Sequence, residues 1–216
     1  MIMRLIRGTL SYANGTAIIY DTPESLFKAW ENEALQITTK GETKMPKIIK
    51  TYRYKVGALR FIGKQYGDGD STNGSFGPKW GEFFQNGWFV TLAQLVTDPV
   101  QTCEDGDAYI GLMRWKDDEP FQYWIGMFFP PGTAAPEGYG YVDFPAGELG
   151  VCWVQGPDGE VYMQEHKCAE KLMEEGMKIA NDEQGASWFF ERYACPRFTE
   201  ADKDGNIVLD VVHYVQ

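Results

Sequence analysis

A single carboxylate within a run of aromatic residues has the clearest chemical potential in this sequence. The run reads WFFERYAC over residues 188–195. Side chains alternate between the two faces of a β-strand, so Glu191 is expected to share a face with Phe189 and Tyr193. One interpretation pairs Glu191 with an arginine or leaves it in solvent. The other puts it at the bottom of an aromatic pocket, where it attracts cations or, with a raised pKa, transfers protons.

Two further segments share an aromatic–Ile–Gly pattern, YIGLM over 109–113 and WIGMF over 124–128. We expect the isoleucine and the residue two positions later to face helices. The aromatic residue and the glycine then face away, and glycine leaves room for a ligand or another backbone. Core packing or a dimer interface is the alternative. Together with Glu191, the candidate ligand-binding residues are Tyr193, Tyr109, Trp115, Trp124 and Trp153.

The elements that must position these residues fall into two similar halves. The first half is expected to hold a strand over about 47–63, a helix over about 80–92, and strands near 107–116 and 121–129. The second half is expected to hold a strand or bent strand pair over 139–155, a helix over about 161–180, and strands near 187–198 and 206–215. Strand–helix–strand–strand, twice, predicts an α+β fold with helices on one side of an antiparallel sheet.

The first 45 residues differ in pattern from the rest. Residues 9–13 and 16–20 flank Asn14-Gly15, a strong signal for a two-residue hairpin turn. Asp21-Thr22-Pro23-Glu24 then predicts the start of a helix with an apolar face formed by Leu26, Phe27 and Trp30.

Charge and composition exclude several classes of protein. The chain has 20 Lys and Arg against 31 Asp and Glu, a net charge of −11, without the basic cluster that nucleic-acid binding needs. The four cysteines form no CxxC pair, and His166-x-Cys168 is a weak metal pattern, so we expect no metal and no cofactor. The absence of a membrane-length apolar run indicates a cytoplasmic protein with reduced thiols that does not contact a membrane.

Several stretches, in order, resemble the GyrI-like domain, the effector-binding domain of many AraC-type and other bacterial regulators. They are YKVGALRFIG over 54–63, AYIGLM over 108–113, QYWIGM over 122–127, PEGYGYVDFPAG over 136–147, and residues 188–193. The resemblance implies two pseudo-symmetric strand–helix–strand–strand units with a groove between them for lipophilic, often cationic, small molecules. It also implies that Glu191 is the ligand-binding carboxylate. On this basis residues 46–216 are the GyrI-like domain and residues 1–45 an N-terminal hairpin–helix extension.

These observations lead to one expected function and two alternatives. The expected function is a stand-alone protein that binds a lipophilic, aromatic or cationic small molecule. The first alternative is a hydrolase of the cyclopropane-opening type, in which Glu191 would be the catalytic residue. The second is a gyrase-inhibitor-like protein that binds another protein, and a homodimer is also left open. Residues 1–45 are too few for two helix-turn-helix units, so we expect no direct binding to DNA.

Overall fold

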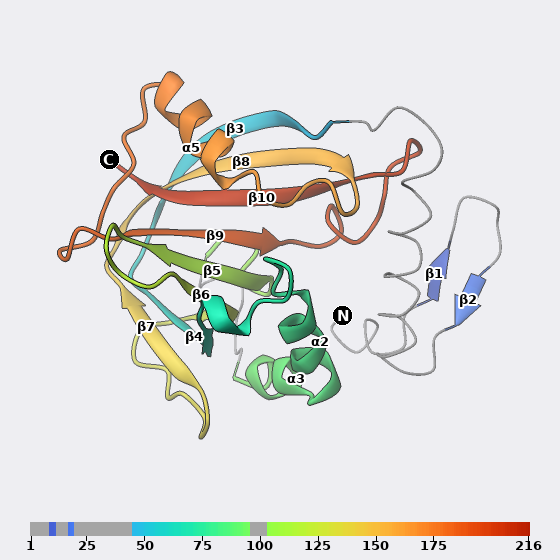
Figure 1. Ribbon diagram of the computed structural model, residues 1–216, viewed down its shortest axis with the longest axis horizontal. Helices are drawn as coiled ribbons and strands as arrows, with labels where there is room; N and C mark the ends of the chain where they lie inside the picture. Colours follow the sequence, from blue (N-terminus) through green and yellow to red (C-terminus); the bar gives the residue numbers. More distant parts are fainter. Residues whose placement is uncertain (1–8, 12–16, 20–44, 96–102) are drawn as a thin grey trace.

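The computed structural model describes residues 9–11, 17–19, 45–95 and 103–216. Its centre is an eight-stranded sheet in which every pair of neighbouring strands is antiparallel (Figure 1). The strands of this sheet are β3 (Lys47–Val56), β4 (Leu59–Tyr66), β5 (Tyr109–Trp115), β6 (Gln122–Phe129), β7 (Gly140–Phe144), β8 (Gly147–Pro157), β9 (Ser187–Tyr193) and β10 (Asn206–Val215). The helices are η2 (Asp68–Asp70), α2 (Gly77–Gln85), α3 (Trp88–Ala93) and α5 (Glu165–Glu174).

The order of the strands shows the expected duplication. The sheet runs β3-β8-β10-β9-β5-β6-β4-β7. One unit is β4–α2/α3–β5–β6 and the other is β8–α5–β9–β10, and in each the third strand lies between the first two. The units meet where β9 pairs with β5, and β3 and β7 extend the two edges. The predicted α+β class and the repeated strand–helix–strand–strand order are confirmed.

Several predicted elements are shorter or divided. The strand expected over 47–63 breaks after Val56 into β3 and β4. The helix expected over 80–92 is two helices, because Gly87 between them takes a left-handed backbone with φ of 66°. The second long helix is limited to Glu165–Glu174, with the left-handed Gly176 two residues beyond its end. No helix in the described residues is long and apolar enough to span a membrane.

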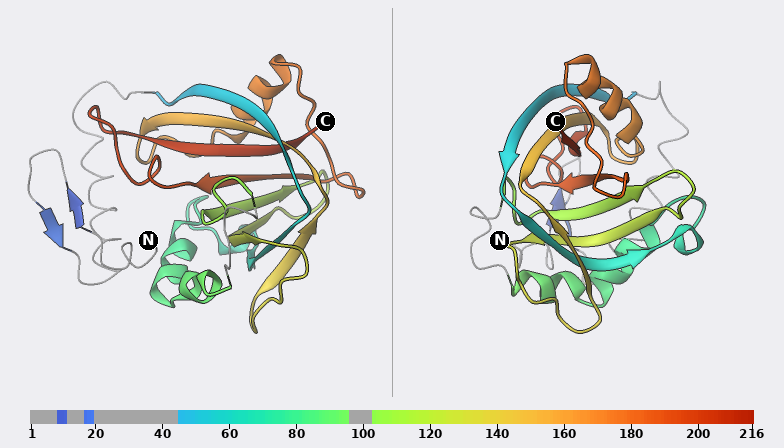
Figure 2. Two further views of the ribbon diagram at one scale, coloured as in Figure 1. Left: turned by 180° about the vertical axis from the view of Figure 1, so that it is seen from behind. Right: turned by 90° about the vertical axis from the view of Figure 1, so that its left-hand side faces the viewer.

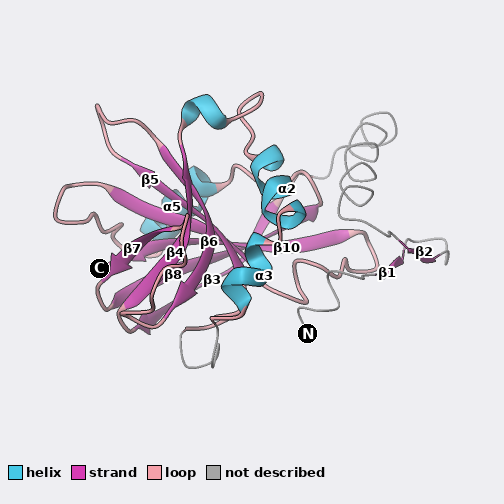
Figure 3. Ribbon diagram, turned by 90° about the horizontal axis from the view of Figure 1, so that it is seen from below, coloured by secondary structure: helices cyan, strands magenta, loops and turns pink. Residues whose placement is uncertain are grey.

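The sheet is strongly curled (Figure 2). Its two faces have different cores. We call the core on the face away from the helices the inner cluster; it includes Phe61, Leu112, Trp124, Phe128, Phe190 and Val212. The opposite face packs against the helices, shown in cyan in Figure 3. Phe83, Phe89 and Leu92 of α2 and α3 pack on the first unit, and Cys168 and Leu172 of α5 pack on the second.

The orientation expected for the two aromatic–Ile–Gly segments is right for β6 and wrong for β5. Ile125 and Met127 pack with the helices, whereas Ile110 and Leu112 belong to the inner cluster. The register explains the difference, because Ile110 lies opposite Gly126 rather than opposite Ile125. Residues directly opposite each other in an antiparallel pair point to the same face, so a one-residue offset reverses the pattern.

The two strands predicted for the N-terminal hairpin are confirmed. β1 (Thr9–Ser11) pairs antiparallel with β2 (Ala17–Ile19), with Leu10 opposite Ile18. The Asn14-Gly15 turn and the helix predicted from Asp21 lie outside the described residues.

Close approach of strands β4 and β6 yields a stability prediction. A Cβ added at Gly126 would lie 2.1 Å from the Ile62 carbonyl oxygen, so Gly126→Ala must displace backbone. We expect a loss of about 2–4 kcal/mol in the free energy of unfolding, measured by urea denaturation. Gly57→Ala is the matched control, because nothing lies within 4 Å of its added Cβ. A similar loss in both variants would contradict the explanation.

Candidate functional site

Glu191 lies on a central strand where the two units meet. On β9 it is opposite Gly111 of β5 and opposite Val211 of β10. Its side chain points to the helix-covered face, as do Phe189 and Tyr193, which pack with the cores on that side. Glu191 is 5% exposed. The sequence-based assignment of these side chains to one face is therefore correct.

Gly111 provides the space that this carboxyl group occupies. A Cβ at Gly111 would lie 2.6 Å from the Tyr123 hydroxyl and 3.4 Å from Glu191 Oε2. Strand β6 brings Tyr123 from one side of β5 and strand β9 brings Glu191 from the other. Because glycine has no side chain, the two polar groups can approach each other above β5.

Polar side chains from helix α2 and from strands β6 and β9 lie around the carboxyl group. The Trp80 indole N–H donates to the Tyr123 hydroxyl at 3.0 Å. The Tyr123 hydroxyl influences the pKa of the neighbouring Tyr193 hydroxyl, which donates to Glu191 Oε2 at 2.6 Å. Trp80 also packs edge-on against the Tyr193 ring, with centroids 4.6 Å apart. Tyr123 thus accepts a hydrogen bond from α2, and Tyr193 donates one to Glu191.

A second carboxyl group, that of Glu165, is hydrogen-bonded to Glu191. Glu165 is the first residue of α5, and its own backbone N–H is among the groups that stabilise its ionised form. The backbone carbonyl of Glu165 contacts His213 Nε2 at 3.2 Å. Burial lowers the pKa of His213 to about 4, so the neutral ring donates this bond and holds the start of α5 against the sheet.

Burial and the neighbouring carboxylate decide where the proton of this pair resides. Burial, followed by the charge of Glu165, raises the pKa of Glu191 to about 8. Burial also raises the pKa of Glu165, but its hydrogen bond to Glu191 acts in the opposite direction. The pKa values of both carboxyl groups are thus raised, and near neutral pH Glu191 retains its proton. The pKa of the Tyr193 hydroxyl is raised well above its usual value, mainly by burial, so it remains a donor.

The structure gathers only some of the candidate residues around Glu191. Tyr193 contacts it directly. Tyr109 lies on the same face, opposite Tyr193, and stacks on Phe89 with centroids 3.8 Å apart. Trp115 is at the far end of β5 and 50% exposed. Trp124 and Trp153 pack with the inner cluster on the other face of the sheet.

The surroundings of Glu191 also include residues that sequence reasoning missed, namely Trp80, Tyr123 and Glu165. Glu165 precedes the buried Cys168 by three residues and the buried Leu172 by seven. That spacing on one helical face could have identified it. Tyr123 carried no such signal, because its direction depends on the register between β5 and β6.

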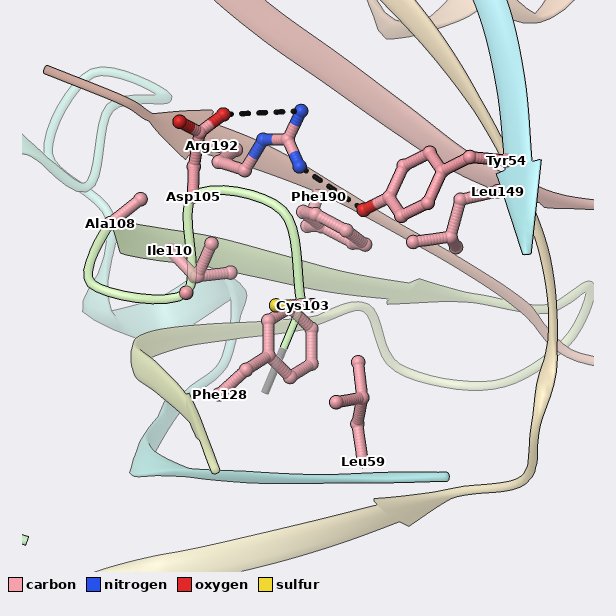
Figure 4. Close-up of a pocket in the computed structure, with 11 residues that line it drawn as sticks. Tyr54, Leu59, Cys103, Asp105, Ala108, Ile110, Phe128, Leu149, Phe190 and Arg192 are labelled. Atoms are coloured by element: carbon pink, nitrogen blue, oxygen red, sulfur yellow. Dashed lines mark hydrogen bonds and ion pairs between the residues drawn. The ribbon is translucent and has the colours of Figure 1, made fainter. Parts of the chain in front are cut away.

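The arginine beside Glu191 belongs to a different cluster, on the inner face. Arg192 Nη2 donates to Asp210 Oδ2 at 2.7 Å, and Arg192 Nη1 donates to the Tyr54 hydroxyl at 3.2 Å. Figure 4 shows the latter bond beside a cavity of about 10 Å³, which is at the lower limit for one water molecule. Among the described residues, Glu191 thus interacts with Tyr193 and Glu165, and its neighbour Arg192 pairs with Asp210 on the other face.

Comparison with known proteins supports the fold. SAV2435, solved bound to tetraphenylphosphonium, aligns with a TM-score of 0.56 and 16% identity over 78% of this chain and 94% of its own. A protein assigned to bacterial transcription regulation in Staphylococcus aureus MU50 aligns with a TM-score of 0.54 and 15% identity, over 77% and 98% of the two chains. No protein-family profile and no curated protein sequence matches this chain. The chain has the fold expected from its resemblance to GyrI-like effector-binding domains.

The buried acid yields a prediction about stability and pH. The folded state binds a proton on Glu191 up to about pH 8, whereas the ordinary pKa of the group is 4.5. Between these values the folded state holds more protons than the unfolded state, so this group makes stability fall as pH rises. Glu191→Gln keeps a donor toward Glu165 and an acceptor for Tyr193 but cannot ionise. Its free energy of unfolding, relative to wild type, should therefore increase by roughly 2 kcal/mol or more from about pH 5 to 8.

Denaturation series in urea at several pH values measure this difference. The control is Glu200→Gln at an exposed position, for which we expect no such trend. A constant difference between Glu191→Gln and wild type across the pH range would show that Glu191 is ionised throughout.

Proposed function

We propose that this protein binds a lipophilic organic cation at Glu191. The observation that supports the proposal most directly is the carboxyl group of Glu191, 5% exposed and surrounded by Trp80, Tyr123 and Tyr193. A buried carboxylate attracts a cation strongly, and aromatic faces add cation–π attraction of roughly 0.5–2 kcal/mol. SAV2435, which shares the fold, was solved with such a cation bound.

Entry of the ligand requires movement of side chains and loss of a proton. The two cavities of about 10 and 380 Å³ described for this chain do not include Glu191. Trp80 and Tyr193, which are half-buried and pack on each other, form part of its cover. In this proposal the ligand displaces Trp80, and Glu191 ionises to become the counter-charge. The cation thus exchanges for the proton.

We further propose that residues 46–216 act as one binding module, with residues 1–45 as an extension. In this proposal the protein works in the cytoplasm and reports ligand binding to a bacterial regulatory system. The shared fold with a protein assigned to transcription regulation motivates this setting.

The first functional prediction concerns charge. Glu191→Gln should weaken binding of tetraphenylphosphonium by roughly 5- to 100-fold, the effect of losing a charge-assisted contact. Binding of the neutral triphenylphosphine oxide should change less than about threefold. Both affinities are measured by tryptophan fluorescence titration, with Glu200→Gln as the matched variant. Equal loss for the two ligands would assign Glu191 a structural role only.

The second functional prediction concerns pH. Because the cation binds the ionised form, its affinity for the wild type should rise by up to roughly tenfold per pH unit below the Glu191 pKa of about 8. Above that pH the affinity should level off. Affinity for Glu191→Gln should be nearly constant over the same range. A flat profile for the wild type would contradict exchange of the cation for a proton.

Hydrolysis is a second candidate function, favoured by the polar groups that surround Glu191. A protonated Glu191, with Glu165 as its base and Tyr193 as a donor, has the composition of a general acid–base set. Incubation with a compound that contains a reactive cyclopropane ring tests this candidate. Addition of one water molecule, seen by mass spectrometry and lost in Glu191→Gln, would favour a hydrolase over a binding protein.

A further inference from the structure

An open groove lies at the edge of the unit that contains β4, α2, α3, β5 and β6, away from the residues that surround Glu191. Strand β7 pairs with β4 only as far as the pair Gly63–Gly140, whereas β4 continues to Tyr66. A groove of about 380 Å³ lies beside this unpaired end of β4, lined also by Glu82 of α2 and Trp88 of α3. Its volume is in the range of small-molecule sites.

Lys64 provides the groove with a positive charge that has no carboxylate partner in the described residues. Its Nζ donates to the Gly138 carbonyl oxygen at 2.6 Å. It also lies 4.3 Å from the centre of the Trp88 ring and 4.6 Å from that of Tyr139. No ion pair joins Lys64 to any acid in the part of the chain that the structure describes. An ammonium group has three donors, so two remain for other acceptors.

The half-buried position of Lys64 makes this unpaired charge significant. Burial lowers the pKa of Lys64, which shows that water compensates its charge less well than at the surface. Ring faces and one carbonyl group compensate it in part. An anion in the groove would accept hydrogen bonds from the Lys64 ammonium group and compensate the rest of its charge.

The other polar groups of the groove agree with an anionic ligand. The Tyr66 hydroxyl is buried and has no hydrogen-bond partner within residues 45–95 and 103–216, so it is an unused donor beside the groove. Glu82 is the one acid among the lining residues, and Lys79 Nζ already pairs with it at 2.9 Å. Trp88 and Trp124 supply the apolar lining.

We propose that this groove binds an aromatic carboxylate, with the carboxylate on Lys64 and the ring against the tryptophan side chains. The inference goes beyond the proposed function, because it concerns a ligand of opposite charge at residues other than those around Glu191. The two proposals can therefore fail independently.

Titration of the full chain with 1-naphthoate and its neutral analogue 1-naphthamide tests the proposal by isothermal calorimetry. We expect the carboxylate to bind at least fivefold more tightly than the amide at low salt. Lys64→Met keeps the apolar stem and should reduce naphthoate affinity at least tenfold. Lys203→Met removes an exposed lysine of the β9–β10 turn that does not line the groove, and should change the affinity less than threefold.

A second variant, for which we expect tighter rather than weaker binding, tests the proposal even if Lys64→Met folds poorly. Glu82→Gln removes the negative charge of the groove and should strengthen naphthoate binding twofold or more. Equal affinity of wild type for naphthoate and naphthamide would overturn the proposal. Unchanged naphthoate binding in Lys64→Met would also overturn it. So would tighter binding of 1-naphthylmethylammonium than of naphthoate, if Glu82→Gln abolishes the binding of that cation.

Discussion

The hydrogen-bonded carboxyl pair of Glu191 and Glu165 links the elements on the helix-covered face of the sheet. Glu191 belongs to β9 and Glu165 to α5, so the pair ties a helix to the strand beneath it. Tyr193, which donates to the same carboxyl group, packs against Trp80 of α2, in the other unit. Burying a carboxyl group is unfavourable, and holding it as the neutral acid with a hydrogen bond from Tyr193 reduces that cost.

Strand β9 carries two buried ionisable residues in succession, Glu191 and Arg192, and their surroundings differ. Arg192, which is 2% exposed, points to the inner face and pairs with Asp210, which is fully buried. Burial of a guanidinium group is offset there by a carboxylate and two tyrosine hydroxyls. Glu191 has no such counter-charge among the residues that the structure describes, and it keeps its proton instead. The Arg192 cluster is thus suited to hold strands together, whereas the Glu191 cluster can respond to a cation or to pH.

Local sequence pattern was enough to predict the alternation of β9, the repeated order of elements and the two strands of the N-terminal hairpin. Each of these features depends on residues that are neighbours in the chain, or on the regular spacing of side chains within one helix or strand. The surroundings of Glu191 could not be predicted in the same way. Tyr123 and Gly111 come together through the register of three strands, and Trp124 was assigned to the site although register directs it to the inner cluster. Register between distant strands depends on the whole sheet, so local patterns do not reveal it.

The junction of β5 and β9 has a consequence for stoichiometry. The two units are similar in architecture but joined in one chain, so facing positions at their junction are encoded separately and can differ. At one such pair Gly111 contributes only space and Glu191 contributes the acid. Two identical, separate units joined through the same strands would repeat this pair on both sides of a symmetry axis and so hold two acids. In the fused chain the pair occurs once, and a molecule that engages the Glu191 carboxyl does so with one equivalent per chain.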